Sequence, residues 1–208
     1  MKQLFLCSYF GGVKNLFRQY VSEKQLGKHV LFIPTAGNVE EYRGYIDEAL
    51  QTFADLGFQV EVLDISACDR ETAQAKIFQS KILYVSGGNT FYLLQELKKK
   101  QLLSLIKEQI ADGMVYVGES AGAIITAKDI DYNKLMDDKG VATELHDTEA
   151  LSEVDFYVLP HVGEEPFVES AQATLDTYSD QLNLLPLNNR QAVLVEGEEV
   201  KVLEEDIH

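Results

Sequence analysis

Short apolar runs alternate with amphipathic stretches along most of this chain, and this alternation constrains the fold more than any other feature of the sequence. The runs that predict strands lie at residues 2–7, 29–34, 58–64, 81–85, 114–117 and 155–160. The stretches that predict helices lie at residues 13–24, 40–56, 71–79, 90–100, 102–111, 123–127 and 167–182. Strands that alternate with helices are typical of an α/β fold, in which helices sandwich a mostly parallel sheet.

The C-terminal part of the chain departs from this alternation. Three further strands are expected at residues 184–187, 192–195 and 200–203. Gly197 lies between the last two and predicts a tight turn, so these two strands are expected to form an antiparallel β-hairpin. The polar segment 128–152 is expected to run irregularly over the surface. Because no repeat or linker interrupts the pattern, residues 1–208 are expected to form a single domain.

The charge balance excludes several classes of partner. The chain carries 34 acidic against 18 basic side chains, a net charge of −16 over 208 residues. Such a chain repels nucleic-acid phosphates and anionic lipid surfaces, so neither nucleic acid nor a membrane is expected as a partner. No apolar run approaches the length of a membrane span, and the N-terminal stretch is a poor signal peptide. We therefore expect a cytoplasmic protein.

Cysteine and histidine usage gives no sign of a metal or a disulfide framework. The two cysteines, Cys7 and Cys68, are expected to be reduced structural thiols. The sequence has no His-x-x-x-His pair and no Cys/His cluster, and it lacks the glycine patterns of phosphate- and dinucleotide-binding loops. No cofactor is expected.

The sharpest motif is Gly118-Glu119-Ser120-Ala121-Gly122, which follows an expected strand and precedes an expected helix. A serine on such a strand-to-helix turn projects above the sheet edge, where it can act as a nucleophile. The small neighbours are needed because the turn is cramped. The Ala121 N–H could then be one donor of an oxyanion hole. The alternative interpretation is a helix-capping turn with Ser120 as the N-cap.

A second loop, Ser86-Gly87-Gly88-Asn89-Thr90, also joins an expected strand to an expected helix. Ligands of open α/β sheets bind beyond the carboxyl ends of the strands. The Gly88 N–H is therefore the natural second oxyanion donor, although a plain glycine-rich turn remains an alternative interpretation.

A serine nucleophile needs a base, and His161 is the best placed of the four histidines. It directly follows the expected strand 155–160, which would place it at the same sheet edge as Ser120. His29 begins a strand at the opposite end, His146 lies in the polar excursion, and His208 is the last residue.

Together these three segments resemble the dipeptidase E family of serine peptidases in residues, order and spacing. The resemblance implies a fold similar to that of class I glutamine amidotransferases, and hydrolysis of small peptides by acyl transfer. It implies Ser120 as the nucleophile, His161 as the base, and the N–H groups of Gly88 and Ala121 as the oxyanion hole.

The third catalytic residue departs from the family pattern of Ser-His-Glu. The matching stretch, residues 187–191, holds no carboxylate, and Asn189 is the candidate by position. An asparagine carbonyl can hold the useful histidine tautomer but supplies no full charge. Carboxylates that could replace it are Glu164, Glu165, Asp129 and Asp131.

The substrate and two alternative functions stay open. Lys128 and Arg190 are the candidate cations for a substrate carboxylate, but neither justifies assigning Asp-X dipeptides. An α/β-hydrolase esterase would need the order Ser, acid, His, met here by Asp180 and His208. A ligand-binding protein without activity on the same scaffold is the other alternative, because fold does not fix function.

Overall fold

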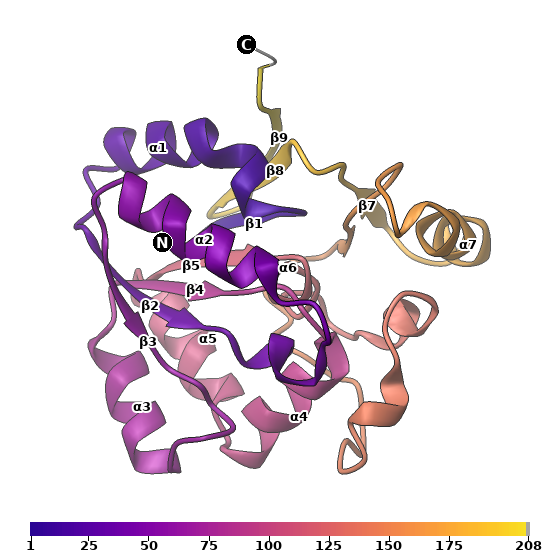
Figure 1. The fold of residues 1–208 in the computed structure, drawn as a ribbon, viewed down its shortest axis with the longest axis horizontal. Coiled ribbons are helices and arrows are strands. Elements are labelled where there is room, and N and C mark those ends of the chain that lie inside the picture. The colour runs from indigo at the N-terminus through magenta and orange to yellow at the C-terminus, as the bar shows by residue number, and fades with distance from the viewer. Residues whose placement is uncertain (207–208) are drawn as a thin grey trace.

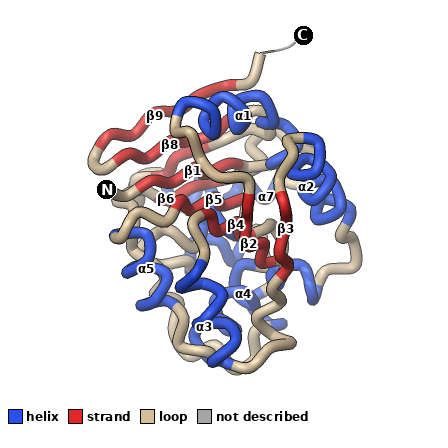
Figure 2. The backbone as a smooth tube through the Cα atoms, turned by 90° about the vertical axis from the view of Figure 1, so that its left-hand side faces the viewer, coloured by secondary structure: helices blue, strands red, loops and turns tan. Residues whose placement is uncertain are grey.

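The computed structural model describes residues 1–206, and its centre is a seven-stranded sheet in the order β3-β2-β4-β5-β1-β8-β9. Figure 2 shows these strands in succession from β9 to β3. The five strands from β3 to β1 are parallel, and β8 and β9 add an antiparallel hairpin beside β1. The expected mostly parallel sheet and C-terminal hairpin are both confirmed. The strands are β1 (Gln3–Cys7), β2 (His29–Ile33), β3 (Gln59–Val62), β4 (Ile82–Val85), β5 (Val115–Glu119), β8 (Gln191–Glu196) and β9 (Glu199–Glu204).

The central strands are apolar on both faces because helices cover both. In β1, Leu4 and Leu6 pack into one core and Phe5 and Cys7 into the other. The first core lies under α3 (Arg70–Gln79), α4 (Thr90–Lys99) and α5 (Leu103–Ala111), and the second under α1 (Lys14–Glu23) and α2 (Gly44–Asp55) (Figure 1). Burying a large apolar side chain stabilises the fold by about 1.5–3 kcal/mol. Apolar packing on both faces therefore stabilises the sheet.

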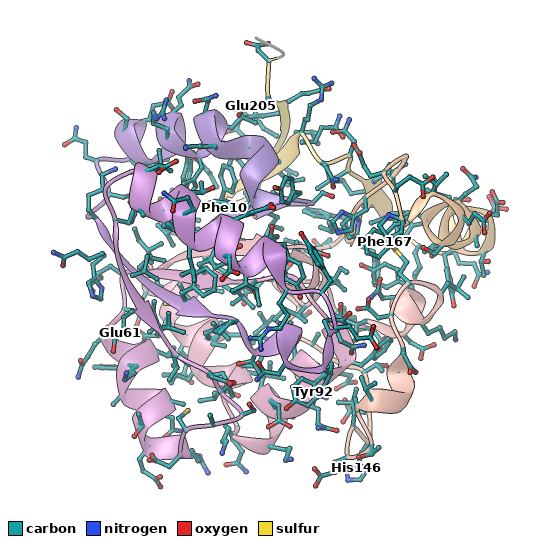
Figure 3. The ribbon with its side chains drawn as sticks, viewed as in Figure 1. Phe10, Glu61, Tyr92, His146, Phe167 and Glu205 are labelled. Carbon is teal, nitrogen blue, oxygen red and sulfur yellow. The ribbon has the colours of Figure 1, made fainter. Side chains whose placement is uncertain are left out.

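Aromatic rings dominate the core under α1 and α2. The Phe10 ring stacks on Phe53 at 4.8 Å between centroids and meets the edge of Phe17 at 5.0 Å. Figure 3 shows Phe10 between the two helices. Phe10 opens the short 3-10 helix Phe10–Val13 that leads from β1 into α1, so its burial fixes the chain just after the end of β1.

The strand that precedes His161 lies outside the central sheet, which corrects one expectation from the sequence. Among residues 1–206, β6 (Tyr157–Leu159) pairs only with β7 (Leu184–Pro186), as a separate parallel pair. The helix α7 (Val168–Tyr178) connects them and lies to the right of the central sheet in Figure 1. The reason is that β8 occupies the place beside β1, so the short β6 has no free edge there.

The polar segment 128–152 is irregular, as expected, but it is tied to the body. It contains two short 3-10 helices, Asp131–Leu135 and Lys139–Val141, and a bridge between Asp129 and Glu149. Asp137 Oδ2 accepts the Thr90 N–H at the start of α4 at 2.8 Å. Among residues 1–206, no helix is long and apolar enough to cross a membrane.

Candidate active site

The candidate catalytic groups gather where β1, β4 and β5 end. These strands are parallel and in register, with Cys7 opposite Glu119 and Val85 opposite Gly118. The residues that follow each strand therefore meet at one edge of the sheet. The Ser120 N–H donates to the Cys7 carbonyl at 2.9 Å, which ties the turn after β5 to the end of β1.

Ser120 occupies a strained backbone conformation, with φ 46° and ψ −106°. Conformations of this kind cost about 1–3 kcal/mol and persist only where the surroundings enforce them. The turn requires glycine at both ends of the motif, because any larger side chain would collide with the backbone. A Cβ on Gly122 would lie 2.1 Å from the Val85 carbonyl oxygen, and a Cβ on Gly118 would lie 2.5 Å from the Gly122 carbonyl oxygen. The turn continues into the short helix α6 (Ala121–Ile124).

The Ser120 hydroxyl meets the imidazole of His161, with 3.0 Å between Oγ and Nε2. His161 also has a positive φ, 61°, and lies two residues after the end of β6. The Phe167 ring stacks on the imidazole at 4.5 Å and 19° between planes. Figure 3 shows Phe167 beside the start of α7, on the side toward the central sheet. This stacking limits rotation of the imidazole.

Asn189 lies on the other side of the imidazole, with its Oδ1 2.8 Å from His161 Nδ1. It belongs to the turn between β7 and β8. The turn packs closely on the loop after β1, since a Cβ on Gly12 would lie 1.9 Å from the Asn189 carbonyl oxygen. The two loops therefore hold each other in place.

The alternative carboxylates lie elsewhere in the described part of the chain. Glu164 accepts the Asn189 backbone N–H at 3.3 Å. Asp129 accepts the Thr148 hydroxyl, and Asp131 pairs with two lysines. Glu165 is exposed. Within residues 1–206, none of these four carboxylates hydrogen-bonds the imidazole.

The remaining residues singled out from the sequence lie away from this edge or outside the described chain. His29 is exposed at the amino end of β2, and His146 lines a surface pocket with Asp129 and Glu149. Arg190 pairs with Glu204 on β9 at 2.7 Å, and Lys128 is exposed. His208 lies outside the described residues, and Asp180 is exposed after α7.

Burial sets the protonation state of His161. Burial lowers the pKa of the imidazole below its usual value, while the Asn189 hydrogen bond and the negative charge of Glu164 raise that pKa. The lowering dominates, so the imidazole is neutral at neutral pH and can accept a proton at Nε2.

Glu119, beside Ser120, is a buried carboxyl that links three segments. Its Oε1 accepts the Phe10 N–H at 2.8 Å, and its Oε2 accepts the Tyr84 hydroxyl at 2.6 Å and the Gly87 N–H at 3.3 Å. Burial raises the pKa of this carboxyl, and the hydrogen bonds lower it. Glu119 thus ties the glycine loop after β4 to the turn that carries Ser120.

The glycine loop lies against the nucleophile. Gly88 has φ 127°, and a Cβ there would lie 2.3 Å from the Ala36 carbonyl carbon, so only glycine fits. The preceding Gly87 would place its Cβ 3.4 Å from that of Ser120. Among the hydrogen bonds of residues 1–206, neither the Gly88 nor the Ala121 N–H has a protein acceptor. Both N–H groups are therefore available to a ligand oxygen.

The sequence did not point to Phe167 or Ser8, or to the role of Glu119 in linking three segments. Ser8 is buried just after β1, and its Oγ lies 2.8 Å from Asn189 Oδ1 and 3.1 Å from His161 Nδ1. The signal that could have found it is its position directly after an apolar strand. No group of three or more metal-ligating side chains occurs among residues 1–206.

The fold, together with its matches to known proteins, defines a serine-type peptidase. The model of peptidase family S51 matches residues 7–203. The chain belongs to peptidase family S51.

Two of the similar proteins match nearly the whole chain, and a third matches part of it. An uncharacterized peptidase of Pasteurella multocida is 46% identical over 198 residues, which is 95% of each protein. A crystal structure from Listeria monocytogenes, provisionally assigned as a peptidase E, superposes with a TM-score of 0.94 at 41% identity and covers 99% of this chain and 100% of that one. Peptidase E of a Shewanella species is 36% identical over 133 residues, 63% of this chain and 52% of that protein.

Proposed function

We propose that this peptidase cleaves small peptides through an acyl-enzyme formed on Ser120, with His161 as the base. The observation that carries the proposal is the 3.0 Å approach between Ser120 Oγ and His161 Nε2, at the carboxyl ends of the strands. Nucleophile and base within hydrogen-bond reach, with the base held by a third group, is the arrangement that activates a serine.

In the first half-reaction, Ser120 Oγ attacks the peptide carbonyl while its proton passes to His161 Nε2. The carbonyl oxygen becomes an oxyanion, which the N–H groups of Gly88 and Ala121 stabilise. One such donor contributes about 3 kcal/mol to transition-state stabilisation. His161 then donates its Nε2 proton to the leaving amine, the C–N bond breaks, and the acyl group remains on Ser120.

In the second half-reaction, water replaces the amine. His161 removes a proton from the water as the water attacks the acyl-enzyme carbonyl. The proton then returns to Ser120 Oγ as the ester bond breaks and the carboxylic acid leaves. Each half-reaction begins with His161 neutral, its proton on Nδ1 and Nε2 free to accept a proton.

Asn189 is the proposed third member. Its Oδ1 accepts a hydrogen bond from His161 Nδ1–H and so keeps Nε2 free. It carries no full negative charge that could stabilise the imidazolium. The expected consequence is a peptidase with lower turnover than one that uses a carboxylate at this place.

We also propose the cytoplasm as the location and peptides, not nucleic acids, as the partners. Both cysteines are free, which fits a reducing compartment. The net charge of −16 disfavours phosphate-rich partners.

The test is hydrolysis of a mixed panel of di- and tripeptides, followed by mass spectrometry, for the wild type and Ser120→Ala. We expect cleavage of at least one peptide, reduced about 10⁴-fold or more by Ser120→Ala. The matched control is Ser104→Ala, on the exposed surface of α5, which should cleave like the wild type. Unchanged turnover in Ser120→Ala would remove Ser120 from the mechanism.

A further inference from the structure

We propose that Ser8 is a positioning residue that fixes the Asn189 amide, and through it the His161 tautomer on which the proposed acyl transfer depends. Ser8 directly follows β1 and is fully buried. Its Oγ lies 2.7 Å from the His161 backbone nitrogen, 2.8 Å from Asn189 Oδ1 and 3.1 Å from His161 Nδ1. One hydroxyl thus contacts both residues of the pair.

One arrangement of the protons satisfies three donors of this cluster: the imidazole N–H, the His161 backbone N–H and the Ser8 hydroxyl. Nε2 must be free to accept from Ser120, so the single imidazole proton resides on Nδ1, where it faces Asn189 Oδ1 at 2.8 Å. Ser8 Oγ accepts the His161 backbone N–H, and the Ser8 hydroxyl proton is donated to Asn189 Oδ1. The amide oxygen then receives two donors, and each of these three donors has an acceptor.

The opposite orientation of the Asn189 amide leaves a donor without an acceptor. It would direct the NH₂ group toward both Nδ1 and Ser8. Nδ1 has only one lone pair, for which the amide N–H and the Ser8 hydroxyl would compete. An unsatisfied donor in a buried site is unfavourable. Ser8 therefore selects the amide orientation that keeps the proton on Nδ1.

This selection matters because the third residue is an amide. A carboxylate has two acceptor oxygens, so turning it over changes nothing for Nδ1–H. An asparagine has one acceptor side and one donor side. Its donor side would favour the tautomer with the proton on Nε2, which cannot accept from Ser120. The hydroxyl of Ser8 supplies the orientation that a carboxylate would not need.

The experiment compares Ser8→Ala in two backgrounds, Asn189 and Asn189→Asp. In the Asn189 background we expect kcat to fall about 30-fold, less than the roughly 10²- to 10⁴-fold that a general base supplies, because part of the His161 population keeps its proton on Nδ1; KM should be unchanged. In the Asn189→Asp background, Ser8→Ala should lower kcat by less than about threefold, because the carboxylate has no donor side. A loss of equal size in both backgrounds overturns the proposal.

Nitrogen NMR of histidine-labelled protein reads the tautomer without any turnover. We expect the wild type to hold its proton on Nδ1 of His161, and Ser8→Ala to show a mixture with Nε2–H. The matched control is Ser80→Ala, which removes another buried serine hydroxyl, one that donates to the Ile82 carbonyl. It should leave the His161 signals unchanged.

The two proposals fail separately. If the wild type cleaves no peptide, the proposed function fails, but the NMR comparison still decides the role of Ser8. If Ser8→Ala keeps a pure Nδ1–H tautomer and full kcat, the Ser8 proposal fails while the peptidase stands. Should Ser8→Ala not fold, Ser8→Cys keeps a side chain of similar size with a much weaker donor and is judged by the same two readouts.

Discussion

Both residues that would perform the chemistry have a positive backbone φ, as do three other non-glycine residues of the described chain. Ser120 and His161 have φ values of 46° and 61°, a region that favours glycine. Each residue is held there by backbone hydrogen bonds, Ser120 to Cys7 and His161 to the Ser8 hydroxyl. These backbone conformations lower the stability of the fold, and they accompany the 3.0 Å approach between Ser120 Oγ and His161 Nε2.

This strain predicts an inverted glycine effect at position 120. Ser120→Gly and Ser120→Ala both lack the hydroxyl, but only alanine keeps a Cβ at positive φ. Ser120→Gly should be more stable than Ser120→Ala by about 1 kcal/mol in urea denaturation, although glycine loses more chain entropy on folding.

The matched control for that comparison is Ala173→Gly, at an exposed position inside α7. There the same exchange should destabilise by about 1 kcal/mol, which is the ordinary helix effect. If the glycine variant unfolds at lower urea than the alanine form at both positions, the backbone of Ser120 carries no strain.

The protonation of His161 predicts the acid side of the pH profile. Because burial lowers the pKa of the imidazole, the rise of kcat/KM with pH should be centred below about 6.5, the usual histidine value. Glu164→Gln removes a negative charge that raises this pKa, so the rise should move to still lower pH. Glu169→Gln, on the exposed surface of α7, should leave the profile in place. A shift of the Glu164→Gln profile toward higher pH would contradict this electrostatic account.

At the scale of elements, the site is assembled from segments that fix each other across the sheet edge. Glu119 joins the end of β5 to the loop after β4 and to the 3-10 helix after β1. The segment 128–152 holds the start of α4 in a similar way, through Asp137 and Thr90. The helix α4 begins right after the glycine loop, so this contact also limits movement of Gly88.

Asp137 predicts a pH-dependent contribution to stability. Burial raises the pKa of its carboxyl to about 6, above the ordinary 3.8. The folded state therefore holds the proton more tightly, and the stability it contributes is full below about pH 4 and is lost as the pH rises through about 6. Between these pH values the wild type should lose on the order of 1 kcal/mol relative to Asp137→Asn.

Urea denaturation at a series of pH values measures this difference. Asp138→Asn makes the same change of charge at the neighbouring exposed position and should track the wild type. A constant difference between wild type and Asp137→Asn across the range would show that the Asp137 carboxyl titrates alike in the folded and unfolded chain.

At the scale of the whole molecule, four distant parts of the chain meet around one imidazole. Local patterns in the sequence were sufficient for the parallel sheet, the hairpin, and the turns that carry Ser120 and Gly88, because strand ends and glycine spacing are local features. The place of His161 next to Ser120 agrees with the expectation, but its strand belongs to the β6–β7 pair and not to the central sheet. Strand order depends on long-range pairing, which the alternation of elements does not encode.

Ser8 illustrates the same limit. A serine after a strand is common, and its meaning here depends on β1 lying between β5 and β8. That order brings Ser8 beside His161 and Asn189, which are 153 and 181 residues away along the chain. The candidate Asn189 came from its match to the family pattern, and the four carboxylates stayed open because no local pattern ranks side chains that meet only through the fold.

The most direct test of the account is covalent labelling with a fluorophosphonate, which reacts with an activated serine hydroxyl and is then mapped by mass spectrometry. We predict that the wild type carries the label on Ser120, that the label is lost in His161→Ala, and that Ser104 stays unlabelled. A folded wild type that takes up no label at Ser120 at any pH, or a label that persists on Ser120 in His161→Ala at the wild-type rate, would contradict the account.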